Sequence, residues 1–389
     1  MSDWQEVSWD FARTSASGAV SPLLHELVPL TKSLDRRIAD DYFALCDLSP
    51  YTTSAMDGWA VSGEGPWKIL GDVKAGAPYE KTLGEGFALR IATGAVIPQG
   101  TFGVVRWENA KEINGEIHAS VVAGADIRPA GEECSKGELL AIKGTRLSPS
   151  LLGLLASTGY DQIKVFRRPR VAVLLLGDEL QHSGIPTRGM VRDSLGPQLP
   201  GWLERLGAEV VSLTYVTDEL ESVVRAIHNV VPTCDLIVTT GGTADGPRDH
   251  VHAAIKSSEH SFLVDRIRSR PGHPALLAMI ASHTQIPLLG LPGNPQSAIV
   301  GLMTLGAPLL GAFQSEKLPD LALVRTRDEL SAPKDFTRLI LGNLIDGEFV
   351  MGEHLGSAML RGLAFSSGFA VAKEGTTPVG GQVRWLPLP

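Results

Sequence analysis

The sequence has few cysteines and no excess of basic residues. Its three cysteines, Cys46, Cys134 and Cys234, are far apart and lack the close spacing of metal ligands, which indicates unpaired thiols in a reducing compartment. Asp and Glu number 43 against 35 Lys and Arg, giving a net charge of −8. Nucleic acid is therefore not expected as a partner, because binding its phosphates requires a basic excess.

The N-terminus also lacks a basic stretch followed by an apolar segment, so we expect no signal peptide. Apolar runs such as residues 171–176 and 287–291 are too short to cross a bilayer. These absences predict a cytoplasmic protein that does not bind membranes. At 389 residues with 43% hydrophobic content, the chain is long enough for two to four well-packed domains.

Residues 169–313 alternate apolar strand patterns with helical patterns. Strands are expected at 171–176, 209–215, 235–239 and 286–291, and helices at 198–206, 218–230 and 295–310, with Thr217 or Asp218 capping the second helix. This order predicts a doubly wound α/β domain. Shorter β-like alternation flanks it over about 54–125 and after 318, so the fold class is multidomain α/β plus β. The basic run 167–170 is read as a solvated domain junction.

Three polar loops follow the predicted strands, at 177–179, 240–242 and 292–294. Ligands of doubly wound sheets bind beyond the carboxyl ends of the strands, so we expect these loops to converge on one crevice. Gly241, Gly242 and Gly246 form a glycine-rich turn whose backbone N–H groups can bind phosphate. Such turns also occur for backbone reasons alone. The neighbouring Asp218, Asp245 and Asp249 suggest that the phosphate is held through a divalent metal.

Seven segments carry a family resemblance in the same order along nearly the whole chain. They are SAMDGWAV (54–61), RIATGAVIP (90–98), RPAGE (128–132), LGDEL (176–180), TGGTADGPRD (240–249), PGHP (271–274) and LPGNPQS (291–297). Together they resemble the signature motifs of the molybdopterin molybdenumtransferases, the MoeA-type enzymes that include the E domain of gephyrin.

The resemblance implies four domains and an obligate homodimer. The domains would be an elongated one from 1–45 and 128–168, a β-rich insertion at 46–127, the α/β domain at 169–313, and a β-barrel-like domain at 318–389. The implied reaction inserts molybdate into adenylylated molybdopterin, releases AMP and requires Mg. Each active site would lie between the α/β domain of one subunit and the β-rich insertion of the other.

The resemblance also implies roles for individual residues. Glu179, Asp218 and Asp249 would hold the metal, directly or through water, and take part in catalysis. The glycine loop, with Thr243 and Asn294, would hold the substrate phosphates. Asp57 would act from the partner subunit as an acid/base or positioning group, and Thr93 would contribute a hydroxyl. Without the resemblance, Asp57 would be read as a turn residue before Gly58, and the metal-binding acids as solvated loop residues.

Molybdate is a tetrahedral oxyanion that requires cationic and hydroxyl donors. The resemblance places Arg270, His273, Ser297, Arg338 and Ser357 in this role. The family pattern has lysines where Arg270 and His273 stand, and an asparagine where Leu195 stands. Because histidines generally lose their charge above about pH 6.5, oxyanion binding is expected to depend on pH.

Three alternatives stay open at this point. A molybdopterin adenylyltransferase, the expected pathway partner, would resemble only the α/β domain and would not require residues 54–61. A catalytically weakened paralogue or scaffold would bind molybdopterin intermediates without converting them, as the changes at His273 and Leu195 allow. Tungstate could replace molybdate, since the two oxyanions are nearly identical in size and charge.

Overall fold

The computed structural model describes residues 6–244, 249–281 and 285–389. It divides into two compact units, one made of Met1–Glu26 with Val165–Pro389 and the other of Leu27–Lys164. We call them unit 1 and unit 2. The four domains expected from the sequence do not map directly onto these units, because residues 1–26 of the expected elongated domain belong to unit 1 and residues 27–45 to unit 2. Their boundaries stay predictions.

Unit 1 contains a six-stranded sheet in the order β17-β14-β18-β22-β21-β19. Its strands are β14 (Arg170–Leu176), β17 (Glu209–Val216), β18 (Leu236–Thr240), β19 (Glu259–Asp265), β21 (Leu276–Ala281) and β22 (Gln285–Leu291). The first four in the sheet order are parallel, while β21 pairs antiparallel with both β22 and β19. The sheet is therefore mixed, with an antiparallel edge that the sequence did not predict.

Helices cover both faces of this sheet. On one face lie α1 (Trp9–Ser17), α3 (Leu195–Arg205), α6 (Pro295–Gly301) and α7 (Ala307–Ala312), and on the other lie α4 (Leu220–Val230) and α5 (Val251–Lys256). Strand β14 shows why: Val171, Val173 and Leu175 belong to the first core, and the residues between them belong to the second. This alternation confirms the doubly wound α/β fold.

The predicted long apolar helix is present but is interrupted by a π-helical turn, η4 (Leu302–Gly306), between α6 and α7. By length and composition alone, the 18-residue segment Pro295–Ala312 could cross a membrane. However, 89% of the segment is buried inside the protein. Its apolar character is thus accounted for by core packing.

A second sheet of unit 1 has the order β1-β20-β25-β27-β29-β23, with β26 paired to β25. The strands are β1 (Val7–Ser8), β20 (Ile267–Arg270), β23 (Leu323–Arg325), β25 (Thr337–Ile345), β26 (Glu348–Met351), β27 (Gly368–Ala372) and β29 (Gln382–Pro387). The predicted C-terminal β region thus gains two strands from elsewhere in the chain. A short pair, β24 (Leu330–Ala332) with β28 (Gly375–Thr377), and helix α8 (Leu360–Ala364) complete this part.

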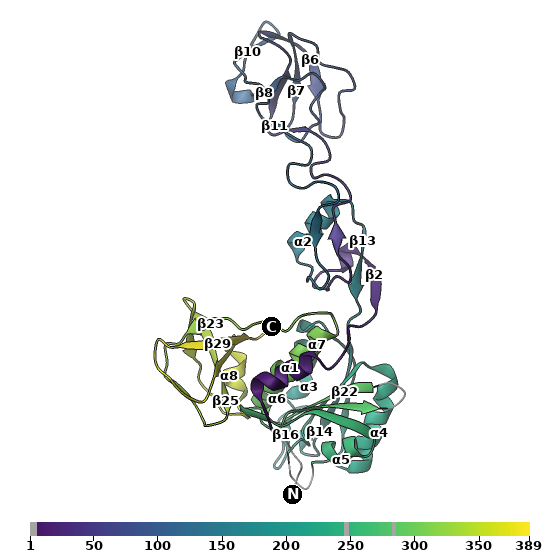
Figure 1. The fold of residues 1–389 in the computed structure, drawn as a ribbon, viewed down its shortest axis with the longest axis vertical. Helices are drawn as coiled ribbons and strands as arrows, with labels where there is room; N and C mark the ends of the chain where they lie inside the picture. The colour runs from purple at the N-terminus through teal and green to yellow at the C-terminus, as the bar shows by residue number, and fades with distance from the viewer. Residues whose placement is uncertain (1–5, 245–248, 282–284) are drawn as a thin grey trace. The chain divides into compact units, whose positions relative to one another are not determined.

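The N-terminal helix α1 connects these two parts of unit 1, and Figure 1 shows it beside α6 and α7. Trp9 is fully buried, and its indole Nε1 donates a hydrogen bond to Thr304 Oγ1 at 2.9 Å. From β29, the Arg384 guanidinium lies over the Trp9 ring and pairs with Asp10. One short helix therefore contacts both the α/β core and the C-terminal sheet.

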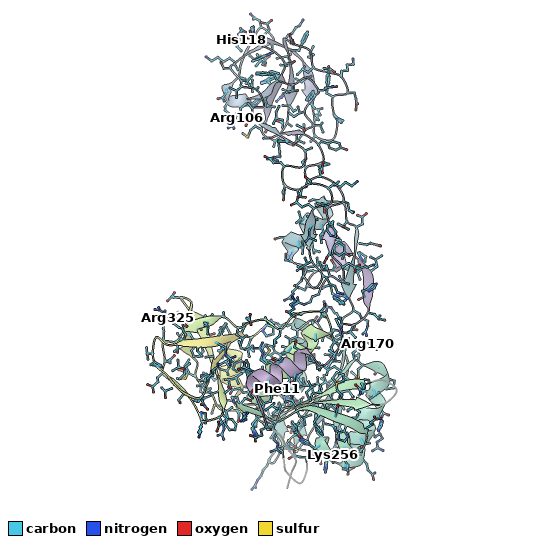
Figure 2. All side chains as sticks on the ribbon, in the orientation of Figure 1. Phe11, Arg106, His118, Arg170, Lys256 and Arg325 are labelled. Carbon is cyan, nitrogen blue, oxygen red and sulfur yellow. The ribbon has the colours of Figure 1, made fainter. Side chains whose placement is uncertain are left out.

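Unit 2 is built on a six-stranded sheet in the order β8-β5-β7-β6-β10-β9. The strands are β5 (Gly58–Val61), β6 (Trp67–Val73), β7 (Phe87–Ile91), β8 (Gly103–Arg106), β9 (Lys111–Ile113) and β10 (Glu116–His118). Arg106, labelled in Figure 2, forms two hydrogen bonds with Asp126 at 2.7 and 2.8 Å. Helix α2 (Pro149–Ser157) begins after Ser148, whose hydroxyl accepts from Leu151 N and caps the helix.

The remaining elements are short. They are β2 (His25–Pro29), η1 (Leu30–Lys32), β3 (Tyr42–Phe43), β4 (Thr53–Ser54), η2 (Trp107–Asn109), β11 (Ile127–Arg128), β12 (Leu139–Ala141), β13 (Gln162–Phe166), β15 (Leu180–Gln181), β16 (Val191–Arg192) and η3 (Val231–Thr233). One predicted cap is wrong: α4 is preceded by Glu219, and the backbone N–H of Glu219 donates to the Thr217 carbonyl in a turn before the helix starts.

Candidate functional site

The three predicted loops meet at the carboxyl ends of the parallel strands. Gly177 follows β14, Gly241 and Gly242 follow β18, and Asn294 lies just after β22; all four line one cavity of about 710 Å³. We call it the loop cavity. The predicted convergence is therefore confirmed, and it places these loops where doubly wound sheets bind ligands.

The glycines at this cavity are required by the backbone. Gly241 and Gly242 have positive φ angles of 79° and 65°. Gly241 N donates to the Leu291 carbonyl at 2.9 Å, and a Cβ on Gly293 would lie 3.7 Å from the Gly241 Cα. Two glycine-containing loops therefore approach closely, which lets an anion reach backbone N–H groups. The predicted residue Gly246, together with Asp245, falls outside the described residues.

Three predicted carboxylates, those of Glu179, Asp218 and Asp249, line the same cavity. Asp178, which the sequence interpretation did not single out, fixes one of them: Asp178 N donates to Asp218 Oδ2 at 3.3 Å, and Asp218 N donates to Asp178 Oδ1 at 3.2 Å. The Glu179 carboxylate folds back over Gly177, where a Cβ would lie 2.9 Å from Glu179 Oε2. Acidic oxygens thus surround the glycine loops.

These acids fit a magnesium ion that is shared with a substrate. Within residues 6–244, 249–281 and 285–389, no three His, Cys, Asp or Glu side chains are grouped closely enough to form a complete metal site. Mg²⁺ commonly binds through one or two carboxylates, with substrate phosphates and waters as the other ligands. Hard oxygen donors beside a phosphate-sized glycine cradle meet that requirement.

The five predicted oxyanion ligands line a second cavity of about 380 Å³: Arg270, His273, Ser297, Arg338 and Ser357. We call it the oxyanion pocket. Arg270 and Arg338 are neighbours in register across the parallel strands β20 and β25. This pairing explains why two residues 68 positions apart in the sequence contribute charge to one pocket.

The two cavities adjoin. Pro274, Pro292 and Asn294 line both of them. Asn294 also precedes α6, whose first turn carries the buried Ser297. Gln296 N donates to the Ser357 carbonyl at 3.0 Å, which fixes the Ser357 loop to the start of α6.

The side chains of the oxyanion pocket are held from several directions. The Arg270 guanidinium lies 5.1 Å from the centre of the Phe336 ring, and Arg338 Nη1 donates to the Ser331 carbonyl at 3.1 Å. A ring nitrogen of His273, Nε2, lies 2.8 Å from Glu6 Oε1. Neither Phe336 nor Glu6 was predicted from the sequence, because neither belongs to a motif.

Asp57 and Thr93 lie in unit 2, whereas both cavities are lined by residues of unit 1. Asp57 Oδ1 accepts hydrogen bonds from Thr93 N at 2.7 Å and Thr93 Oγ1 at 3.1 Å. The next residue must be glycine, because a Cβ on Gly58 would lie 2.0 Å from the Val105 carbonyl oxygen. The exposed Asp57 carboxylate is therefore held in a fixed orientation at the end of the sheet.

Leu195 stands where the family pattern has an asparagine, and the structure shows how this position works without a polar side chain. The buried Asp193 accepts hydrogen bonds from Leu195 N at 2.9 Å, Gly196 N at 3.0 Å and the Tyr215 hydroxyl at 2.9 Å. Burial and the bond to Asp193 raise the pKa of Tyr215. Because Leu195 contributes its backbone N–H while its side chain packs in the core, this corner of the loop cavity keeps its shape without a polar side chain there.

Comparison with known proteins agrees with this geometry. Residues 7–159 match the MoeA N-terminal region (domain I and II), and residues 172–312 match a family described as a probable molybdopterin binding domain. The molybdopterin molybdenumtransferase of Bacillus subtilis (strain 168) is 32% identical over 335 residues, covering 81% of this chain and 77% of the relative. That of Staphylococcus aureus (strain MSSA476) is 29% identical over 330 residues, covering 80% and 78%.

The solved structure of a molybdopterin biosynthesis moea protein from Pyrococcus horikosii has a TM-score of 0.81 at 26% identity. It covers 99% of this chain and 100% of that chain. The match thus includes both units and not the α/β part alone. The chain belongs to the MoeA-type molybdopterin molybdenumtransferase family, the transferases of molybdenum cofactor biosynthesis.

Proposed function

We propose that the protein inserts molybdate into adenylylated molybdopterin and releases AMP. The observation that supports this most directly is the pair of adjoining cavities, which share Pro274, Pro292 and Asn294. The loop cavity offers glycine backbone donors and carboxylates, as a nucleotide phosphate with its metal requires. The oxyanion pocket offers two arginines and two serine hydroxyls, which suit a tetrahedral dianion.

In the proposed reaction, two dithiolene sulfurs bind molybdenum and their protons leave with one oxo oxygen as water. A water molecule splits the phosphoanhydride, so that AMP departs and no water is consumed overall. Molybdenum keeps its oxidation state, and no external oxidant or reductant is required. Arg270 and Arg338 would hold the oxyanion beside the sulfurs, which converts a collision of two anions into a positioned encounter.

We propose Glu179, Asp218 and Asp249 as the residues that hold Mg²⁺. When bound, the ion would polarise the phosphoanhydride and neutralise charge on the leaving AMP. The reciprocal hydrogen bonds between Asp178 and Asp218 would keep the Asp218 carboxylate oriented before substrate arrives. Gly242 and Thr243 would bind phosphate oxygens, while Gly241, whose N–H is bonded to the Leu291 carbonyl, would shape the loop around the phosphate.

We further propose that the protein acts as a homodimer in the cytoplasm, with Asp57 and Thr93 supplied by the partner subunit. The family resemblance suggests this arrangement, and the fixed, exposed carboxylate of Asp57 is suited to acting on a substrate bound elsewhere. A molybdopterin adenylyltransferase would supply the adenylylated substrate.

The proposal is tested by measuring AMP release from adenylylated molybdopterin with the purified protein. We expect release that requires both molybdate and Mg²⁺, and a rate lower by about 100-fold or more for Asp57→Ala, as is typical when an acid/base group is lost. Asp72→Ala is the matched control, because Asp72 is an exposed acid on the same sheet of unit 2. Tight substrate binding without release by the wild-type protein would instead support a non-catalytic carrier.

A further inference from the structure

The short strand β1 brings an acidic residue to the oxyanion pocket. Val7 and Ser8 pair in parallel with Ile267 and Arg268 of β20, and Val7 N donates to the Arg266 carbonyl at 3.2 Å. Strand β20 leads directly into the turn that carries Arg270 and His273. The pairing therefore places Glu6, immediately before β1, beside this turn.

Glu6 forms a close contact with one of the pocket's cationic residues. Its Oε1 lies 2.8 Å from His273 Nε2. The Glu6 side chain is 40% exposed and that of His273 is 31% exposed, so the pair lies at the protein surface and not in its core. The His273 ring also lies near the Phe336 ring, with 5.9 Å between ring centres.

This contact is unfavourable for a pocket that binds anions. Among the described residues that line the pocket, none is acidic, while Arg270 and Arg338 carry fixed positive charges. His273 adds a further positive charge only when it is protonated. In either protonation state of His273, Glu6 lowers the charge near the pocket by one and accepts the hydrogen bond that Nε2 could donate.

We infer that Glu6 is an internal competitor for the oxyanion pocket, an affinity-determining residue whose carboxylate holds His273 until a tetrahedral oxyanion displaces it. The inference rests on the proposed function of this pocket. It follows from charge and geometry: a dianion gains the His273 donor only if Glu6 releases it, and the surface position of Glu6 leaves it room to move away. The effect is to raise the oxyanion concentration at which the pocket fills.

The test is molybdate binding, measured by isothermal titration calorimetry on the full chain at low ionic strength. Glu6→Gln keeps the shape of the side chain and removes its charge, so we expect it to tighten molybdate binding at least about threefold, with the gain shrinking at high salt. The control Glu204→Gln removes the charge of an exposed residue of α3 that lines neither cavity, and it should leave affinity unchanged.

A second comparison distinguishes competition for His273 from a general effect of charge. If Glu6 competes for that ring, Glu6→Gln should give little or no gain in a His273→Ala background. Equal or weaker binding by Glu6→Gln, or a gain that persists without His273, would overturn the inference. Thermal unfolding of each variant checks that the fold is retained.

Arg338→Ala separates failure of this inference from failure of the proposed function. If the wild type binds molybdate and Arg338→Ala does not, the oxyanion pocket stands and only the role of Glu6 is in question. If molybdate binds neither the wild type nor Glu6→Gln, or binds Arg338→Ala as well as the wild type, the assignment of the pocket itself is overturned.

Discussion

At the scale of single residues, the basic run at 167–170 has a structural role that its sequence does not reveal. The junction expected there is confirmed, since the boundary between the two units falls at residue 165, but the run is only partly solvated. Arg167 donates to both oxygens of Asp235 at 2.6 and 2.9 Å. Arg170 N also donates to Asp235 Oδ2 at 2.8 Å. Burial alone would raise the pKa of Asp235, but the hydrogen bonds and charges of the two arginines outweigh it and lower the pKa.

This ion pair predicts a pH-dependent loss of stability. Because the folded-state pKa of Asp235 is lowered, its contribution is present at neutral pH and is lost as pH falls through that pKa, below the ordinary value of about 3.9. Asp235→Asn should reduce the free energy of unfolding by about 1–3 kcal/mol at pH 7, as loss of a charged hydrogen-bond partner typically does.

Urea unfolding of the wild type and Asp235→Asn at pH 7 and at the lowest pH where both still fold measures this effect. The difference in unfolding free energy should shrink toward acid pH. A difference that is constant or grows as pH falls would contradict the assigned charge of Asp235.

Residues within contiguous motifs were predictable, whereas their partners were not. The motifs contain Asp57, Glu179 and Asp249, and the structure brings the two of them in unit 1 to the wall of the loop cavity. Glu6 lies 267 positions from His273, and such a contact depends on strand pairing that no local pattern encodes.

At the scale of elements, the turn at residues 271–274, which follows β20, shapes the oxyanion pocket. Gly272 has a φ of 96°, and a Cβ there would lie 2.7 Å from Val300 Cγ1 on α6. Glycine is therefore required twice, once for the backbone conformation and once for close packing. The turn carries Arg270 and His273 into the pocket only when it lies against α6.

Gly272→Ala should therefore weaken molybdate binding. It should also lower the free energy of unfolding by more than the strain of an alanine at positive φ, because the added Cβ would clash with Val300. The matched control is Gly375→Ala, because Gly375 has a φ of 94° and a Cβ added there would meet nothing within 4 Å. We expect a cost of about 1 kcal/mol at Gly375 and a larger one, roughly 2–4 kcal/mol, at Gly272. Equal unfolding free energies for the two variants would contradict the packing argument.

The hydrophobic pattern predicted the elements with strong periodicity and missed those set by tertiary context. Strand β14 and helix α4 lie close to their expected positions, because one is a continuous apolar run and the other has a regular apolar periodicity. Strands β19 and β21 were missed because the antiparallel edge follows from chain reversal around residues 267–275. The π-helical turn η4 interrupts an otherwise uniform apolar helix where Thr304 bonds Trp9.

At the scale of the whole molecule, the residues proposed for one reaction are divided between the two units. The cavities and the proposed metal ligands belong to unit 1, while Asp57 and Thr93 belong to unit 2. The family resemblance implies both groups and the supply of Asp57 by a partner subunit, and this arrangement stays a prediction. The central claim is that one active site combines unit 1 of one subunit with unit 2 of its partner.

The most direct test is complementation between two inactive variants, Asp57→Ala and Glu179→Ala, produced together with different affinity tags and purified as the mixed dimer. If sites are shared, one site carries both substitutions and the other carries neither, so the mixed dimer should release AMP at about half the wild-type rate. Each homodimer should be inactive. A mixed dimer as inactive as the homodimers, or recovery of monomers only, would contradict the shared active site.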